Sequence, residues 1–179
     1  MDEPRIEPLA DAELHGKALE LMQPMLDADR GFNIFRTMAH HPDLARRWLV
    51  FGNHVLAKST LPSRERELVI LRVAWLCQAE YEWAHHKLIG IDSGLTAEQI
   101  ERIKEGPATG WSELDRLALT ATDELHHDKI ISDVTWAGLC VHWSEQQLMD
   151  LVFAVGQYTL VSMALRSFGV PLDDFLDGF

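Results

Sequence analysis

The strongest constraint on the fold is the helical spacing of apolar residues along nearly the whole of this 179-residue chain. Apolar positions recur every three or four residues, and we find no convincing alternation at every second position, the pattern that marks half-buried strands. We therefore predict an all-α fold. Helices are expected at about 11–26, 33–40, 42–56, 64–76, 79–93, 97–105, 113–128, 133–143 and 145–168.

Capping residues mark the ends of these predicted helices. A serine or threonine just before a helix can accept a hydrogen bond from a free backbone N–H group. Such residues stand at Ser63, Thr96, Ser112, Ser132 and Ser144. Gly94 and Gly169 follow predicted helices, where a residue in the left-handed conformation is favoured. Pro24 is expected to end or kink the first helix.

The last predicted helix is apolar nearly all round, although polar residues such as Asp150 and Gln157 interrupt it. A helix of this kind is central to its own domain or shared with a partner subunit, and its polar residues argue against a membrane span. We expect one structural domain, with residues 1–60 as a helical arm packed on a core of residues 61–179. We also expect a homo-oligomer, as a dimer, trimer or hexamer.

Charge and cysteine content exclude several classes of function. The formal net charge is −12, which opposes binding to nucleic acid or anionic membranes, because both need basic patches. Two cysteines, Cys77 and Cys140, lie in different segments, and the acidic N-terminus lacks the basic and apolar parts of a signal peptide. We expect a cytoplasmic protein that acts on a small molecule and binds neither nucleic acid nor membrane.

Residues 61–94 hold the most informative set of polar side chains. Glu82 and His86 are four residues apart, so they share one face of a helix. Glu67 lies fifteen residues before Glu82, and antiparallel packing of two helices that break near residues 77–79 would bring it back. Two carboxylates around an imidazole can form a proton relay. The same residue types are also common on solvated helix surfaces, which spacing alone does not exclude.

The same window resembles the carboxymuconolactone decarboxylase and alkylhydroperoxidase D superfamily, in particular through YEWAHH followed by GLTAEQI. In its peroxidase branch a glutamate precedes a CxxC pair, and a histidine follows the second cysteine by four residues. The matching positions here are Glu67, Ala79, Glu82 and His86. The resemblance implies an alkylhydroperoxidase D-like helical bundle, whereas both redox cysteines are missing, so disulfide-forming peroxide reduction is not expected.

The decarboxylase branch is the better match. It is similar in lacking CxxC, in a basic stretch matched by Arg64 and Arg66, and in the pair Glu82 and His86. This resemblance implies a cofactor-free lyase or decarboxylase, or an isomerase, that moves protons on a small carboxylated compound, aromatic-derived ones included. The chain departs from that branch in its N-terminal arm and in Glu67, where the branch usually has no acid.

Five residues are the candidate catalytic groups. His86 would act as general base or acid, held by Glu82 or Glu67. Tyr81 or His85 would donate a hydrogen bond to a developing oxyanion or enolate. Core or interface packing is the alternative role for Tyr81.

Four further residues are candidates for binding the substrate. An arginine such as Arg72 or Arg64 could clamp a carboxylate, since the planar guanidinium suits it. His54 and His126 could approach the same pocket from other helices. A solvated surface position is the alternative for the arginines, more so for Arg66 than for Arg72, which lies within an apolar run.

Other functions remain open at this point. Cys77 could serve a peroxidase-related antioxidant protein, although a buried structural cysteine is the expected role. Two Glu-xx-His motifs, Glu82 with His85 and Glu124 with His127, resemble the pairs of di-iron helical bundles. We rank a metal-binding protein below the cofactor-free reading and expect no metal ligands. A structural oligomer with a vestigial pocket is the fourth possibility.

Overall fold

The computed structural model describes residues 3–108 and 110–179, and all regular structure within them is helical, as predicted. The α-helices are α1 (Gly16–Asp27), α2 (Asn33–Met38), α3 (Pro42–Asn53), α4 (Ser63–Leu76), α5 (Glu80–Asp92), α6 (Ala97–Ile103), α7 (Glu113–Asp128), α8 (Asp133–Leu139) and α9 (Glu145–Phe168). A short 3₁₀ turn at Asp11–Glu13 precedes α1, and a π-helical turn at His54–Lys58 follows α3.

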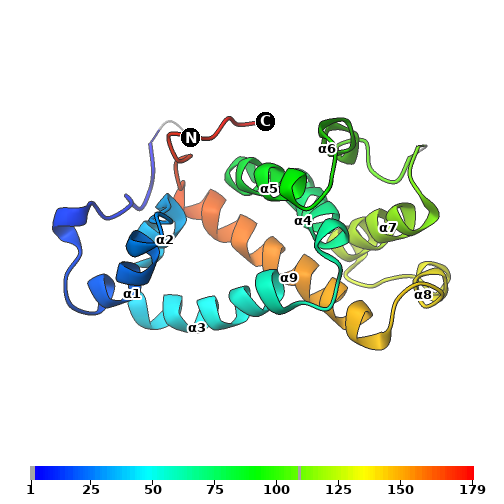
Figure 1. Ribbon diagram of the computed structural model, residues 1–179, viewed down its shortest axis with the longest axis horizontal. Helices are drawn as coiled ribbons and strands as arrows, with labels where there is room; N and C mark the ends of the chain where they lie inside the picture. The colour runs from blue at the N-terminus through cyan, green and yellow to red at the C-terminus, as the bar shows by residue number, and fades with distance from the viewer. Residues whose placement is uncertain (1–2, 109) are drawn as a thin grey trace.

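Helix α4 lies at the centre of the main core. It packs against α5, α7 and α9 (Figure 1), and its residues from Glu67 to Ala74 are all buried. A helix that contacts neighbours on three sides needs apolar residues around most of its circumference. Glu67 and Arg72, the charged residues of this stretch, therefore need hydrogen-bond or ion-pair partners, because burial of an unpaired charge is costly.

The N-terminal helices form a separate group at one end of the molecule. Figure 1 shows α1, α2 and α3 beside the C-terminal half of α9, away from α6, α7 and α8. Their own small core includes Leu14, Met22 and Ala45. A third apolar cluster, built on Tyr81 and Val161, joins the arm to α5 and α9. The space between arm and core lies beside this joint.

Most of the predicted helix ends are confirmed. The side chains of Thr96, Ser112, Ser132 and Ser144 accept backbone hydrogen bonds at the starts of their helices. Gly94 and Gly169 adopt positive φ angles of 102° and 68°.

Two local predictions were wrong, those for Ser63 and for the start of the first helix, and one of the two alternatives for Pro24 is excluded. Ser63 is the first residue of α4, so Pro62 holds the capping position and makes no side-chain cap bond. Pro24 does not end α1, which continues to Asp27. The first helix does not begin at Asp11, because the chain extends at Leu14 and turns at Gly16, whose φ is +52°.

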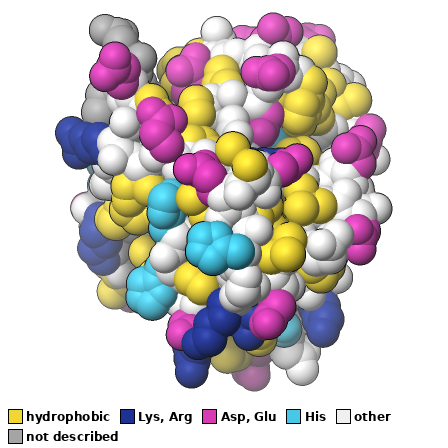
Figure 2. Space-filling view, turned by 90° about the vertical axis from the view of Figure 1, so that its left-hand side faces the viewer, with side chains coloured by type: hydrophobic (Ala, Val, Ile, Leu, Met, Phe, Trp, Pro, Cys, Tyr) yellow, Lys and Arg dark blue, Asp and Glu magenta, His cyan; other side chains and the backbone are white. Residues whose placement is uncertain are grey.

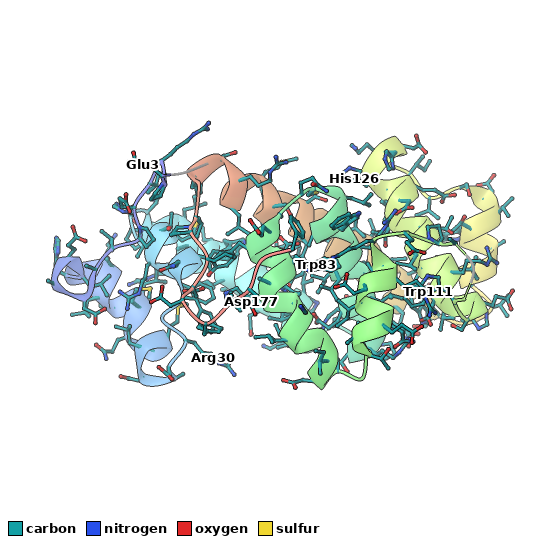
Figure 3. The ribbon with its side chains drawn as sticks, turned by 90° about the horizontal axis from the view of Figure 1, so that it is seen from above. Glu3, Arg30, Trp83, Trp111, His126 and Asp177 are labelled. Atoms are coloured by element: carbon teal, nitrogen blue, oxygen red, sulfur yellow. The ribbon has the colours of Figure 1, made fainter. Side chains whose placement is uncertain are left out.

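The C-terminal segment after α9 runs back over α5, as Figure 3 shows from above, with Asp177 near Trp83. Phe179 packs edge-on against Trp75, with ring centroids 5.3 Å apart, and lies 6.0 Å from the ring of Trp83. This segment therefore ends against the outer side of α5, which carries several of the predicted site residues.

In the described part of the chain, α9 is the one helix whose length and apolar composition would allow it to cross a membrane. Length and composition are the only criteria in this comparison. Half of its most apolar stretch is buried inside the protein, chiefly against α4. Figure 2 shows the end of the molecule formed by the arm, where acidic, basic, apolar and histidine side chains are intermingled on one face.

Candidate functional site

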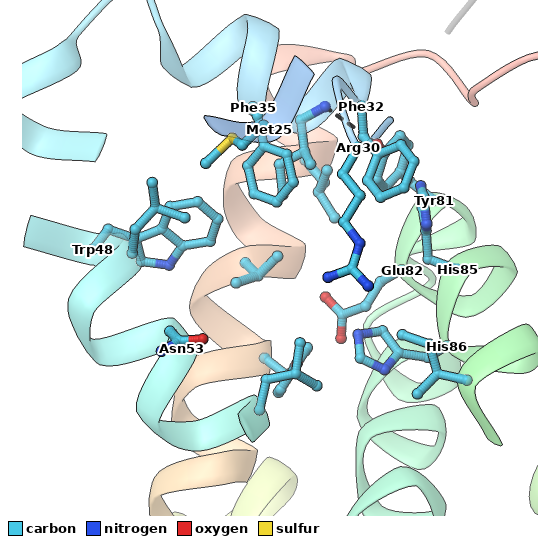
Figure 4. Close-up of a pocket in the computed structure, with 18 of the residues that line it drawn as sticks. Met25, Arg30, Phe32, Phe35, Trp48, Asn53, Tyr81, Glu82, His85 and His86 are labelled. Carbon is cyan, nitrogen blue, oxygen red and sulfur yellow. Dashed lines mark hydrogen bonds between the residues drawn. The ribbon is translucent and has the colours of Figure 1, made fainter. Parts of the chain in front are cut away.

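A cavity of about 410 Å³ lies between the arm and the core. Its walls come from the end of α1, the loop before α2, and helices α2, α3, α5 and α9, and Figure 4 shows its labelled residues. Most of its lining is apolar, including Phe32, Phe35 and Trp48. A mostly apolar cavity with a few polar groups is the usual form of a small-molecule site. The polar and charged lining residues are Arg30, Asn53, Tyr81, Glu82, His85, His86, Gln157 and Tyr158.

His86 and Glu67 form a buried pair across α5 and α4. The Nδ1 atom of His86 lies 2.6 Å from Oε2 of Glu67, whose other oxygen accepts a hydrogen bond from Nε of Arg66 at 3.1 Å. A carboxylate already bound to a guanidinium is an acceptor, so Nδ1 carries the ring proton. Tyr158 holds the imidazole edge-on, with centroids 4.8 Å apart. Nε2 is then the nitrogen available to the cavity as a base.

Glu82 is buried on the next turn of α5, with its carboxyl group beside the imidazole of His86 (Figure 4). Ser162 Oγ donates to its Oε2 at 3.0 Å, while its buried Oε1 has no hydrogen-bond partner among the described residues. Burial raises the pKa of Glu82 well above its usual range, and the Ser162 hydrogen bond offsets this only in part. Burial in the cavity therefore favours the neutral form of this carboxyl group, the form that can donate a proton.

Tyr81 and His85 line the cavity but are tied to the C-terminal segment. The Tyr81 hydroxyl donates to Oδ2 of Asp173 at 2.6 Å, and Nε2 of His85 lies 2.8 Å from the same oxygen. The Asn33 backbone N–H donates to Oδ1 of Asp173 at 2.9 Å. Burial opposes ionisation of Asp173, yet these hydrogen bonds lower its pKa. Burial, with Asp173, raises the pKa of Tyr81, so its proton stays on the hydroxyl.

The structure does not bring Arg64 or Arg72 to this cavity. Arg72 donates from Nε and Nη2 to Asp123 at 2.6 and 2.9 Å, and from Nη1 to the carbonyl of Ile103. Arg64 makes a bidentate pair with Asp115 at 2.7 and 3.0 Å. Both guanidinium groups join α4 to α7, so neither is free to clamp a carboxylate in the cavity.

His54 and His126 also lie outside the cavity lining. His54 is more than half exposed, 4.0 Å from Asp150, and its neighbour Asn53 faces the cavity instead. His126 contacts Cys77, with Nδ1 3.8 Å from Sγ, in a second hollow of about 850 Å³. Burial lowers the pKa of His126 and raises that of Cys77.

The two Glu-xx-His motifs serve different contacts. Glu124 accepts hydrogen bonds from the backbone and hydroxyl of Ser132 and from the Thr135 hydroxyl, at 2.8–2.9 Å. His127 Nδ1 lies 2.8 Å from a backbone carbonyl oxygen on its own helix. Within residues 3–108 and 110–179, no three His, Cys, Asp or Glu side chains are grouped so that they could hold a metal ion.

Sequence reasoning missed several residues of the site, among them Tyr158, Arg30, Gln157 and Asp173. Arg30 reaches into the cavity from the loop before α2, and Figure 4 shows its guanidinium pointing toward Glu82. Gln157 presents a buried carbonyl oxygen without a partner in the described chain. Asp173 holds Tyr81 and His85. Gln157 is marked locally as a polar residue within the apolar run of α9. No local pattern marks Arg30 or Asp173, because each comes to the site from a distant segment.

Comparison with known proteins supports the resemblance seen in the sequence. Residues 42–123 match the profile of the carboxymuconolactone decarboxylase family, and this segment includes Glu67, Glu82 and His86. The match supports a place for this segment in the carboxymuconolactone decarboxylase and alkylhydroperoxidase D superfamily. Among curated proteins, none matches the chain in sequence.

Solved structures share the fold of the chain at low sequence identity. A peroxidase-related protein with an alkylhydroperoxidase AhpD core, from Ralstonia eutropha JMP134, has a TM-score of 0.77 and 16% identity over 94% of this chain and 93% of its own. The debrominase Bmp8 has a TM-score of 0.76 and 13% identity over 94% and 92%. A peroxidase-related protein from Silicibacter sp. TM1040 has a TM-score of 0.75 and 13% identity over 97% and 91%.

Proposed function

We propose that the protein is a cofactor-free enzyme that transfers protons on a small carboxylated compound, in an isomerisation, elimination or decarboxylation. One observation carries this proposal. The same apolar cavity is lined by Glu82, a buried carboxyl group whose Oε1 has no partner among the described residues, and by His86, whose Nδ1 is bound to Glu67 and whose Nε2 is available. Burial favours the neutral form of Glu82. Two titratable groups whose surroundings favour opposite roles are the usual mark of an acid–base pair.

The geometry supports a specific sequence of proton movements. His86 Nε2 would take a proton from a carbon next to a carbonyl group, and the electron pair of that C–H bond would move toward the carbonyl oxygen. The Oε1–H group of Glu82 would donate its proton to that oxygen and form an enol. Glu67 would stabilise the imidazolium formed on His86. In an isomerisation, His86 Nε2–H gives its proton to a different carbon while the enol O–H returns its proton to Glu82 and the carbonyl group forms again. In an elimination, the leaving group departs with its bonding electron pair and takes the proton from His86, while the enol O–H returns its proton to Glu82.

The shape and chemistry of the cavity favour a small ring compound. Phe35 and Trp48 form one aromatic wall, with ring centroids 6.4 Å apart. Such walls exclude water and leave few polar groups to orient a ligand. The debrominase Bmp8, which shares this fold, has been solved in complex with 2,3,4-tribromopyrrole. A small unsaturated ring with a carbonyl group is the substrate type that we propose for this cavity.

Exchange of carbon-bound protons with solvent tests this function without knowledge of the full reaction. The protein would be incubated in D₂O with a panel of aromatic oxo acids and unsaturated lactones, and loss of C–H signals followed by ¹H NMR. We expect accelerated exchange for at least one compound, and loss of that acceleration in Glu82→Gln and His86→Gln. Acceleration that persists in both variants would contradict the assignment.

A peroxidase-related function of Cys77 is the second candidate. The specific observation in its favour is the contact between Cys77 Sγ and Nδ1 of His126 at 3.8 Å, in a hollow also lined by Arg166. The thiolate would attack a hydroperoxide, forming a sulfenic acid and an alcohol or water, and an external thiol would be needed to reduce it. Burial raises the pKa of Cys77, which works against this route. Thiol-dependent peroxide consumption that disappears in Cys77→Ala would favour it.

We also propose that the protein assembles as a homo-oligomer. Four large apolar side chains on α9 are each more than half exposed, those of Met149, Phe153, Leu160 and Met163. Neighbouring copies could bury such a surface, which soluble monomers seldom leave open. Sedimentation equilibrium measures the assembly state directly, and a monomer at all concentrations would contradict this proposal.

A further inference from the structure

We infer that Arg30 is the residue that binds the substrate's carboxylate, and that the ligand is a ring compound carrying one carboxylate. This inference rests on the proposed function and narrows its substrate class. It assigns to Arg30 the role that the sequence predicted for Arg64 or Arg72.

Arg30 is the single lysine or arginine among the described residues that line the cavity. Its side chain makes no hydrogen bond or ion pair with the described part of the chain. Arg36, six residues later, differs in this respect. Arg36 donates to the carbonyl oxygens of Gly31 and Leu9 and pairs with Asp11 at 2.7 Å. Arg36 therefore holds the loop in place, while the guanidinium of Arg30 remains available for a ligand.

The backbone of the loop fixes where Arg30 stands. Asp29 adopts a positive φ of 56°, which turns the chain sharply after α1. The N–H group of Arg30 donates to the carbonyl of Met25 at 2.7 Å, and the Arg30 carbonyl accepts from the Phe32 N–H at 2.8 Å. These contacts place Arg30 in the lining of the cavity, and its guanidinium points toward the buried Glu82 (Figure 4).

The kinds of side chain that line the cavity indicate which chemical groups a ligand should carry. Arg30 is exposed, and Glu82 and His86 are buried. Aromatic side chains line the cavity beside Arg30, with Phe32 and Phe35 6.1 Å apart between centroids. A matching ligand combines an anionic group for Arg30, a flat apolar ring for the aromatic walls and a carbonyl group for Glu82 and His86. Because Arg30 is the single lysine or arginine among the described lining residues, it supplies the positive charge that selects a monoanion.

A matched pair of probes tests this inference. Benzoate and benzamide have nearly the same shape and differ in charge, and ligand-observed NMR titration measures the dissociation constant of each. We expect wild-type protein to bind benzoate about tenfold more tightly than benzamide, as one exposed charge-assisted contact allows. Added salt should weaken the binding of benzoate and leave benzamide unchanged.

Three variants separate charge recognition from other effects. In Arg30→Gln the two probes should bind equally, through loss of affinity for benzoate alone, and Arg30→Lys should keep part of the preference. Arg116→Gln, which removes the same charge from an exposed position on α7, should behave as wild type. Equal weakening of both probes in Arg30→Gln, a preference that survives in it, or no preference in wild-type protein would overturn the inference.

The outcome is independent of catalysis. Both proposals hold if Glu82→Gln and His86→Gln lose deuterium exchange and if the preference for benzoate over benzamide depends on Arg30. If no exchange occurs in any protein but the Arg30-dependent preference is present, the proposed reaction fails and this inference stands. If exchange occurs and Arg30→Gln leaves benzoate affinity unchanged, the reaction stands and this inference fails.

Discussion

Buried polar side chains have partners on one side of the core, whereas on the other side a buried carboxyl oxygen has none among the described residues. Where α4 meets α7, Arg72 and Arg64 are each matched by an aspartate, and Arg72 also by backbone carbonyls. In the cavity beside the arm, Glu82 has a buried oxygen without a partner in the described chain. Buried polar groups are usually satisfied because an unmatched one costs stability. Matched groups hold helices together, and unmatched groups that face a cavity are available for a ligand.

The largest effect is expected from a change in the cavity. His86→Gln removes the proposed base, and general acid–base groups typically contribute about 10²–10⁴-fold to a rate. Deuterium exchange should fall by about that factor, while the circular dichroism spectrum of the folded protein remains. His127→Gln, a substitution on the surface of α7, is the matched control. Equal loss in both variants would show that His86 has no special role.

On the opposite side of the core, Arg72→Met should affect stability and leave the chemistry alone. The change leaves Asp123 and the carbonyl of Ile103 without their donor. Breaking a buried pair typically costs about 3–5 kcal/mol, measurable by urea unfolding. The exchange rate per folded molecule should equal that of wild type. A selective loss of exchange would place Arg72 in the functional site after all.

The protonation state of Glu82 predicts a pH dependence of stability. In the unfolded chain this carboxyl ionises near the ordinary glutamate pKa of about 4.3, whereas burial keeps it neutral in the folded protein to a much higher pH. Between these values the unfolded state binds fewer protons, so the free energy of unfolding falls as pH rises.

Comparison with Glu82→Gln isolates this effect, because other titrating groups are common to both proteins. Wild type should lose about 1.4 kcal/mol relative to the variant for each pH unit from about 5 up to the pH at which Glu82 ionises in the folded protein. The difference should stop changing below about pH 4, where both states are protonated. Parallel stability curves across this range would mean that Glu82 is ionised in the folded protein.

The smallest effect is expected for Cys77→Ala, in the second hollow. Cys77 is half-buried and lies outside the cavity that holds Glu82. Loss of its sulfur should cost about 1 kcal/mol or less and leave deuterium exchange unchanged. If this variant instead loses exchange or a measurable peroxidase activity, the second hollow becomes the functional site.

Local features of the fold were predictable from the sequence because their causes are local. A capping serine and a glycine at positive φ act within one helical turn, so Ser112, Ser144 and Gly169 were identified correctly. Ser63 was misplaced by one residue, since Pro62 takes the capping position. The convergence of Glu67, Glu82 and His86 followed from helical spacing and the family resemblance.

The remaining site residues could not be predicted because they act across long separations. Arg30 belongs to a loop of the arm, and Asp173 follows α9, yet both reach the surroundings of α5. Arg72 lies in an apolar run, and this position correctly suggested that it is buried. The sequence does not reveal that the Arg72 guanidinium is already paired with Asp123. Pairing among distant charged residues depends on the packing of helices, which single-residue patterns do not encode.

The ionisation of Glu82 is the most direct test of the account. Protein labelled with ¹³C at the glutamate carboxyl carbons can be titrated by NMR, and Glu82→Gln identifies the signal of interest. We predict that one carboxyl, missing from the variant, titrates well above the usual glutamate range of about 4.3 and remains neutral at neutral pH. If every glutamate signal titrates in the ordinary range, Glu82 is a carboxylate and the cavity lacks the proposed acid.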